Sequence, residues 1–403
     1  MLRRHCLTIL AAAALLTAVP AQSQTRPADW DAVLKAARGQ TVHWNAWGGD
    51  DRTNAFIAWA GEQTLKRHGV AIQHVKLRDT AEAVSRVIAE KAAGRLQGGS
   101  VDLIWINGPN LQAMKQQDLL FGPVTQRLPN FRLVDTKGKP STVIDFTLPV
   151  EGMAVPWTLA QVVFMHNTAR MASPPRSMPA MLDWARANPG RLAHPVPSNF
   201  LGATFLKQAL YELTPDPAIL QQPADDDNFA AATAPLWAWY DALRPHLWRS
   251  GRQYPASGPA QRELMNDGEI DISLSFNPNE ASGAIADGKL PKEVRTYVLD
   301  RGTIGNTSFV AIPFNAANRE GAMVVADFLL SPEAQARMQD PRILGTLTVL
   351  DLARLDAADR KRFEDLPRGV ATLSNAELGN PLLEPHPSWM TRVVAEWERR
   401  YSR

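Results

Sequence analysis

Residues 41–51 read Thr-Val-His-Trp-Asn-Ala-Trp-Gly-Gly-Asp-Asp and combine a strand with the turn that follows it. The β-branched and aromatic residues of 41–47 favour a strand, and the Gly-Gly-Asp-Asp sequence favours a tight turn into a helix. We predict that this helix runs to about His68, because Gly69 is typical of a helix C-terminus. The stretch therefore predicts a strand, glycine turn and helix, the repeating unit of α/β folds.

The same unit recurs directly after this stretch. A second strand is predicted at 71–77, a helix at 80–93 and a nearly all-apolar strand at 101–107. Gly108-Pro109 then opens another helix, since proline suits the first helical position. Strands this apolar suit a parallel sheet that helices cover on both faces.

The alternation of strands and helices is interrupted at 122–149, where proline and polar residues are frequent. A long extended segment follows at 153–168. Extended segments of this length often cross between lobes, and the alternation of helices and strands restarts beyond this one. We predict helices at 178–187, 199–211, 260–266 and up to about 287, and strands at 192–196, 270–276 and 294–299. A strand at 307–312 would return the chain to the first unit, before helices at 319–330 and 332–338.

The predicted fold is therefore a two-lobed α/β fold with a hinge between the lobes. Residues 1–21 are assigned to a signal peptide, 22–155 together with 305–403 to lobe 1, and 156–304 to lobe 2. Two lobes also agree with the length of the chain, because domains typically contain roughly 100 to 200 residues.

The N-terminal segment carries Arg3 and Arg4, then an apolar run, then small residues, which is the pattern of a secretory signal peptide. The run is shorter than the roughly 20 apolar residues that span a bilayer. Cleavage near Ala21 to Ser23 would release a periplasmic protein. The single cysteine, Cys6, precedes the apolar run, so the mature chain would contain no disulfide, thiolate metal site or lipid-bearing cysteine.

Charge and motif searches exclude several classes of protein. The 43 basic and 41 acidic residues nearly balance, and no Lys/Arg-rich run precedes the short 399–403 end, which disfavours a nucleic-acid partner. The sequence contains no Gly-x-Gly pair, no P-loop and no Gly-x-Ser-x-Gly, so the common nucleotide-binding and serine-nucleophile motifs are absent. The eight histidines are scattered and the five tyrosines stand far apart, so we expect no metal and no cofactor.

Four tryptophans fall at or just before the predicted ends of strands: Trp44, Trp47, Trp105 and Trp157. In open α/β sheets, ligands bind outside the carboxyl ends of the strands. Each ring alone is as well explained by core packing, because tryptophan is usually largely buried. Together they favour an organic ligand with a flat or cationic part, which aromatic faces bind well.

The turns that precede helices supply the remaining polar candidates. The segments 48–51, 107–109, 198–202 and 277–280 each join a strand to a helix and direct backbone N–H groups toward the expected cleft. Ordinary helix capping is the alternative explanation for their Ser, Asn and Asp residues. Glu280 differs because glutamate is a weak cap, so we take it as the preferred ligand carboxylate.

Several blocks of sequence resemble a known family. Residues 301–313, Arg-Gly-Thr-Ile-Gly-Asn-Thr-Ser-Phe-Val-Ala-Ile-Pro, together with 326–335, Ala-Asp-Phe-Leu-Leu-Ser-Pro-Glu-Ala-Gln, resemble the late segment of extracellular solute-binding proteins. Residues 156–168 resemble the crossing strand of that family, and 268–271 its entrance to a strand of the second lobe. The resemblance covers nearly the whole mature chain and is greatest to the YnjB-type group. It implies a type II fold with a hinge, a membrane permease and an ATPase.

The combined prediction is a monomeric binding component of an ABC-type importer that captures a small organic solute, cationic or aromatic, in a cleft between the lobes. The expected ligand contacts are Trp44, Trp47, Gly48, Trp105, Asn107, Trp157, Ser198, Asn199, Asn277, Glu280 and Asn306. An oxyanion held by backbone N–H groups is the alternative ligand. A secreted hydrolase without a recognisable motif and a ligand-sensing binding protein are the alternative functions.

Overall fold

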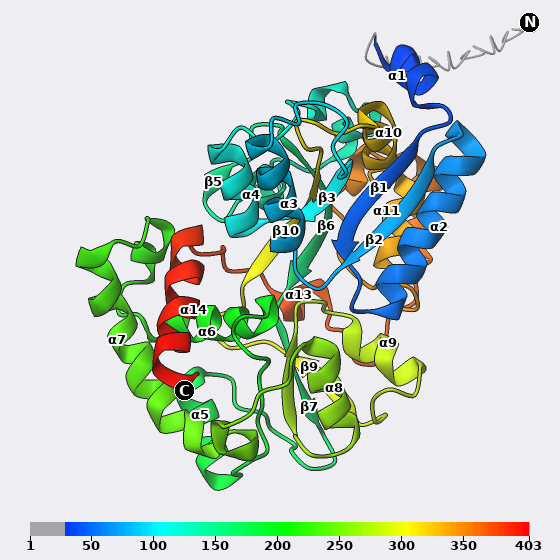
Figure 1. Ribbon diagram of the computed structural model, residues 1–403. Helices are drawn as coiled ribbons and strands as arrows, with labels where there is room; N and C mark the ends of the chain where they lie inside the picture. The colour runs from blue at the N-terminus through cyan, green and yellow to red at the C-terminus, as the bar shows by residue number, and fades with distance from the viewer. Residues whose placement is uncertain (1–28, 403) are drawn as a thin grey trace, which may run out of the picture.

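The computed structural model of the protein describes residues 29–402 and divides them into two α/β lobes joined by extended strands (Figure 1). The predicted signal peptide lies outside the described residues. Among the residues that are described, no helix has both the length and the apolar character that a membrane crossing requires.

Lobe 1 is built on a five-stranded sheet in the order β2-β1-β3-β10-β6. Strands β1 (Thr41–Trp47), β2 (Ala71–Leu77) and β3 (Leu103–Ile106) are parallel, as their apolar sequences predict. Strand β10 (Gly305–Ala311) lies antiparallel between β3 and β6 (Ala154–Gln161). The predicted return of the chain to the first lobe is thus confirmed, and the sheet is mixed rather than wholly parallel.

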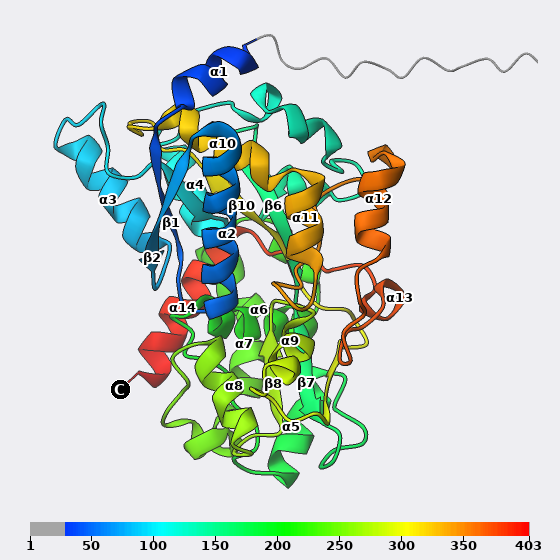
Figure 2. The ribbon, with the colours of Figure 1, turned by 90° about the vertical axis from the view of Figure 1, so that its right-hand side faces the viewer.

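Helices cover both faces of this sheet (Figure 2). On one face α1 (Trp30–Ala37), α2 (Asp51–His68) and α10 (Arg319–Leu329) share a core with the strands, and α3 (Ala81–Ala92) and α4 (Gly108–Gln116) pack on the other face. Helix α2 begins where the Asp50 side chain accepts a hydrogen bond from the Thr53 amide, and it ends at Gly69 with φ of 70°. The glycine stop predicted from the sequence is confirmed, because this left-handed conformation strains other residues.

The remaining elements of lobe 1 come from the irregular middle stretch and the late part of the chain. The stretch 122–149 forms the 3₁₀ helices Thr125–Arg127, Pro129–Leu133 and Pro140–Thr142 and the small hairpin of β4 (Ile144–Asp145) and β5 (Leu148–Pro149). After α10 come α11 (Pro332–Gln339), the 3₁₀ helix Leu352–Arg354, α12 (Ala357–Glu364) and α13 (Asn375–Leu378).

Lobe 2 has a smaller antiparallel sheet in the order β8-β7-β9, formed by β8 (Ile272–Ser275), β7 (Val163–Asn167) and β9 (Val294–Tyr297). Its helices are α5 (Met178–Ala187), α6 (Phe200–Leu213), α7 (Asp226–Leu243), α8 (Gly258–Asn266) and α9 (Glu280–Ala286), with 3₁₀ helices at Pro217–Gln221, Arg244–His246 and Trp248–Gly251. The strand predicted at 192–196 is wrong, since only Leu192 makes isolated bridges there. Pro195 and Pro197 lack the N–H groups that a strand needs.

Two strands cross between the lobes side by side. Strand β6 runs almost directly into β7, and the Val162 amide donates to the Ile304 carbonyl, 2.8 Å away, beside the start of β10. A third crossing follows α13, where Leu382 exchanges backbone hydrogen bonds with Thr303 and Gly305, each 2.9 Å long. The predicted hinge includes the extended segment at 153–168, and the chain therefore crosses between the lobes three times there.

The third crossing leads to the C-terminal helix α14 (Pro387–Tyr401), which packs against α6 of lobe 2 and also contacts α4 of lobe 1 (Figure 1). Trp389, Val393 and Trp397 are buried in the hydrophobic core of lobe 2. The assignment of all of 305–403 to lobe 1 needs correction for this helix, because its apolar stripe is buried by lobe 2.

Candidate functional site

A pocket of about 300 Å³ lies between the lobes, at the end of the junction where α4 faces α14. Lobe 1 lines it from the residues before α3 and at the start of α4, and lobe 2 lines it from the start of α6 and from α14. The lining residues are Asp79, Asn107, Pro109, Asn110, Pro197, Ser198, Phe200, Met390, Thr391, Val394, Ala395 and Glu398. Its size lies at the lower end of the range for small-molecule sites.

Two helices begin at this pocket, one from each lobe. Helix α4 starts at Gly108, whose φ of 55° would strain a larger residue. An added Cβ would also lie 3.0 Å from the Phe146 ring, which would have to shift. Helix α6 starts after Asn199, whose side chain accepts a hydrogen bond from the Leu201 amide at 3.0 Å. The capping explanation of Asn199 is therefore correct for its side-chain oxygen.

The charged side chains that line this pocket are acidic. Asp79 and Glu398 are both exposed and come from lobe 1 and from α14 respectively, and no lysine or arginine is among the lining residues. Amides and hydroxyls of Asn107, Asn110 and Ser198 add neutral polar groups, beside the apolar Phe200. The lining therefore offers carboxylates, neutral hydrogen-bonding groups and an aromatic ring.

A buried ion pair lies directly behind the pocket. Lys207 of α6 and Glu384 of the third crossing approach to 2.6 Å, and their side chains are 0% and 2% exposed. Asn306 of β10 donates to the other oxygen of Glu384 at 2.9 Å. The Lys207 ammonium also lies 4.6 Å from the ring centre of Phe146 and 4.9 Å from that of Phe200, the ring that lines the pocket.

Asp145 of β4 adds a second buried carboxyl group to this cluster. One oxygen accepts a hydrogen bond from the Gly108 amide and the other has no hydrogen-bond partner in the described chain. Burial raises the pKa of Asp145 to about 8, and burial likewise raises the pKa of Glu384 and lowers that of Lys207. These groups link both lobes and two of the crossings, so we name Asp145, Lys207, Asn306 and Glu384 the hinge cluster.

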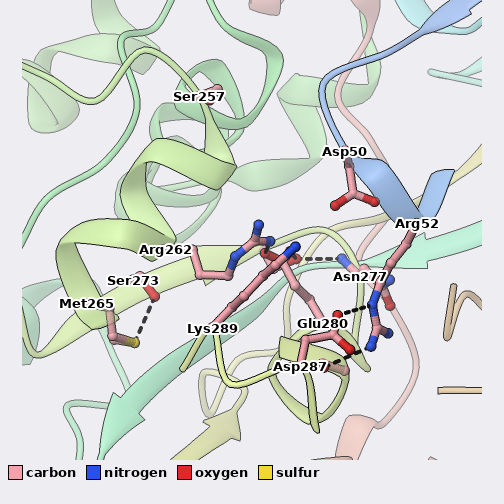
Figure 3. A network of polar contacts seen from close by, with 12 residues as sticks. Asp50, Arg52, Ser257, Arg262, Met265, Ser273, Asn277, Glu280, Asp287 and Lys289 are labelled. Atoms are coloured by element: carbon pink, nitrogen blue, oxygen red, sulfur yellow. Dashed lines mark hydrogen bonds and ion pairs between the residues drawn. The ribbon is translucent and has the colours of Figure 1, made fainter. Parts of the chain in front are cut away.

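The opposite end of the junction is held by direct hydrogen bonds between the lobes (Figure 3). Arg52 of α2 binds the Asp287 carboxylate at 2.9 Å and the Gly283 carbonyl at 2.8 Å, and it also binds the Pro341 carbonyl of lobe 1. Asn277 and Asn279 of lobe 2 donate to the Leu344 and Gly345 carbonyls. These three donors and their acceptors are called the latch below.

Glu280 belongs to the latch end of the junction and not to the pocket. Its two carboxylate oxygens accept hydrogen bonds from Arg262, at 2.8 Å, and from the Ser275 hydroxyl (Figure 3). The prediction that Glu280 orients the ligand is therefore not supported, because neighbours within lobe 2 already satisfy its charge.

The four tryptophans do not line one cleft, so that expectation is wrong. Trp44 and Trp157 are 0% and 1% exposed and pack edge to face, with centroids 5.6 Å apart, in the core beneath α2. Trp105 is partly buried against Trp157, and the ring of Trp47 packs under Gly49. Their strand positions place Trp44, Trp105 and Trp157 on the same helix-covered face of the sheet, which is why core packing accounts for them.

The other predicted contacts divide between the two ends of the junction. Asn107 and Ser198 line the pocket from opposite lobes, Asn199 lies beside it, and Asn306 lies behind it in the hinge cluster. Asn277 is part of the latch, and the Gly48 amide donates within lobe 1 to Leu77. Asp79, Asn110, Glu398, Lys207 and Glu384 were not predicted, because they belong to different elements and only the fold brings them together.

The fold and this junction define a two-lobed binding protein, and comparison with known proteins gives its family. A profile of the bacterial extracellular solute-binding protein family matches residues 59–363, so the chain belongs to that family. Protein YnjB of Escherichia coli (strain K12) is 40% identical over 399 residues, which cover 99% of each chain. The predicted family and the resemblance to the YnjB-type group are confirmed.

Solved structures share the fold at low sequence identity. The spermidine/putrescine ABC transporter substrate-binding protein PotD of Streptococcus pneumoniae has a TM-score of 0.63 at 14% identity, over 90% of this chain and 98% of that one. The periplasmic binding protein AfuA of Actinobacillus pleuropneumoniae, with fructose-6-phosphate bound, has a TM-score of 0.63 at 13% identity, over 90% and 99%. The predicted type II fold is confirmed, and the chain is a solute-binding protein of the ABC transporter class.

Proposed function

We propose that this protein captures a small organic cation with an apolar part in the pocket between α4 and α14, and delivers it to a membrane permease. The observation that carries the proposal is the lining itself, in which Asp79 and Glu398 are the only charged side chains contributed by residues 29–402. A cation would gain from both carboxylates and from the face of Phe200. Closure of the lobes would bring the two walls together around it.

An oxyanion is the second candidate ligand, because helices α4 and α6 both begin at the pocket. The positive ends of their dipoles favour a negative group, although the Gly108 and Leu201 amides already donate to Asp145 and Asn199. The two acidic side chains oppose that choice, so the cation is preferred. Relatives of known structure do not decide between them, since one is named for spermidine and putrescine and another holds fructose-6-phosphate.

We infer that the chain acts as a monomer in the periplasm, after cleavage of its leader near Ala21 to Ser23. The Arg3-Arg4 start with its apolar run and the family of extracellular binding proteins support this location. N-terminal sequencing of periplasmic material would test it, and recovery of the intact leader would contradict it.

Native mass spectrometry of protein purified without denaturation tests the binding function directly, because a retained solute would be weighed with the chain. If the retained solute is still unaltered after incubation with the protein, the result supports binding. If the protein converts it to a product, the result favours the hydrolase alternative. Titration with thiamine, spermidine, choline, glucose and phosphate would then separate cations from sugars and oxyanions.

The matched variants are Asp79→Asn and Glu398→Gln, with Glu62→Gln, an exposed acid on α2 outside the pocket, as the control. We expect each pocket variant to weaken the bound cation by about threefold to tenfold, as for a partly solvated charge pair, and the control to bind normally. Tighter binding of an anion to the pocket variants would instead establish the second candidate.

A further inference from the structure

A second and larger pocket, of about 520 Å³, lies on lobe 1 outside the junction pocket. Helices α2, α11 and α12 and the loop after α11 form its walls. It is lined by Trp59, Glu333, Ala336, Arg337, Asp340, Arg342, Ile343, Arg362 and Leu366. None of these residues lines the pocket between the lobes, and neither the hinge cluster nor the capture of solute described above involves them.

Arg337 is the central charged group of this pocket. Its guanidinium carbon lies 4.6 Å from the ring centre of Trp59, which fixes the plane of the group. Its Nε is buried without a hydrogen-bond acceptor, and within residues 29–402 no carboxylate lies within 4.0 Å of it. Within the same residues its two Nη groups have no hydrogen-bond partner either, so these two groups, and not the buried Nε, are the donors available to a ligand.

The other charges of the pocket are already paired. Glu333 is bound by Arg67 at 2.7 Å, and Asp340 by Arg342 at 2.6 Å. Arg362 contacts Asp359 at 3.0 Å and remains half exposed. With its two acids neutralised in this way, the pocket favours a negative ligand.

We propose that this lobe 1 pocket binds a small organic anion, in which a carboxylate or phosphate meets Arg337 and a flat apolar part packs on Ile343 and Leu366. The planar guanidinium matches such anions in a bidentate arrangement, and its stacking on Trp59 reduces the entropy lost on binding. Arg342 contributes indirectly, because its ion pair with Asp340 neutralises the carboxylate that would otherwise repel the anion.

The pocket shares a wall with the latch. Asp340, Arg342 and Ile343 line the pocket, and the carbonyl of Pro341, which lies between them in the chain, accepts a hydrogen bond from Arg52. The next two residues, Leu344 and Gly345, accept hydrogen bonds from lobe 2. An anion bound here would order the segment that holds the lobes together and would therefore stabilise the closed form. Because such coupling is reciprocal, the closed form should also bind the anion more tightly than the open form does.

Equilibrium dialysis of the exported chain with naphthoate, a flat carboxylate, tests the site, with the neutral naphthamide as the ligand control. We expect saturable binding of naphthoate with a Kd of about 1 mM or lower and at least about tenfold weaker binding to R337Q. R342Q should weaken binding by a smaller factor, which keeps the test valid if R337Q is poorly folded. Naphthamide should bind more weakly than naphthoate to the unmodified chain.

The matched control is R319Q. Arg319 stacks 4.3 Å from the ring centre of Phe121 and also has a buried Nε without an acceptor, but it does not line the pocket. Naphthoate should bind to R319Q and to D79N as to the unmodified chain, and it should slow hydrogen exchange of the amides in 340–345. Absence of saturation at about 10 mM naphthoate, equal binding by R337Q, or protection confined to the pocket between the lobes would overturn the proposal.

Discussion

The two ends of the junction between the lobes are built differently. At the latch end, Arg52, Asn277 and Asn279 join the lobes directly through side chains that reach backbone carbonyls. At the other end the walls stand apart around a pocket, and the hinge cluster behind it carries buried charge. Under the proposed function, this difference separates closure from capture: the latch holds the lobes together at one end, and the solute would complete the contact between the lobes at the other.

The largest expected effect is at the pocket end, where Lys207→Met would leave Glu384 buried without its partner. Removal of one member of a buried pair typically costs about 3 to 5 kcal/mol of unfolding free energy. Urea unfolding monitored by circular dichroism measures this loss. The double variant Lys207→Met/Glu384→Gln is the control and should lose clearly less, since no charge remains unpaired. A single variant as stable as the unmodified chain would show that the hinge cluster contributes nothing to the fold.

The pH dependence of stability tests the same end through Asp145. Because its pKa rises from 3.8 to about 8 on folding, the folded state keeps this carboxyl protonated where the unfolded chain ionises it. Its contribution to stability is complete below pH 4 and is lost as the pH rises from about 4 to about 8. The charged groups of Lys207, Glu384 and Lys115 also face this carboxyl group, and they are the same in both proteins compared below.

Asp145→Asn should remove this loss, since the amide does not titrate. Between pH 5 and pH 8 the stability of the variant relative to the unmodified chain should rise, by at most about 1.4 kcal/mol per pH unit. Urea unfolding at the two pH values measures the change. A constant difference would mean that Asp145 is ionised in the folded protein.

The latch end is tested by Arg52→Ala, which removes three hydrogen bonds that hold lobe 2 and the Pro341 loop. At about 1 kcal/mol per hydrogen bond, the population of the closed form relative to the open form should fall by about tenfold or more. Small-angle scattering should then show a larger radius of gyration, and solute should bind correspondingly more weakly. Arg127→Ala, which breaks an ion pair with Asp29 within lobe 1, should leave both quantities unchanged.

The smallest effect is expected for Glu280→Gln, also at the latch end. Its carboxylate pairs with Arg262 and Ser275 within lobe 2, so stability should fall by about 1 kcal/mol or less. Solute affinity, measured by calorimetry, should stay within about twofold. A tenfold loss of affinity would place the ligand at both ends and remove the distinction between latch and pocket.

Much of the fold could be predicted because local signals agree with tertiary structure. The apolar strands, the Gly69 stop and the proline at the start of α4 each act over a few residues, and each is found as predicted. One failure, the strand at 192–196, is local, because its prolines are visible in the sequence, whereas the placement of the C-terminal helix depends on non-local contacts. The sequence of helix α14 shows an apolar stripe but does not show which lobe buries it. The apolar surface that lobe 2 offers decides where the helix packs.

The pocket could be predicted only in part. The sequence predicts turns at 107–109 and 198–202, and Asn107 and Ser198 of these turns line one pocket from opposite lobes. Tryptophan near a strand end was a poor guide, because residue type does not reveal which face of the sheet a helix covers. The pairing of Lys207 with Glu384 joins residues far apart in the sequence, and a single sequence carries no signal for that contact.

The late segments that complete each lobe also affect how the chain reaches its folded state. Strand β10 is inserted between β3 and β6, and α14 fills the core of lobe 2, so each core lacks an essential part until the last third of the chain is present. A polypeptide still being synthesised can therefore complete neither lobe, and contacts of such long sequence separation form slowly. For the export proposed above, the same topology would leave the chain unfolded while it passes through a translocation channel.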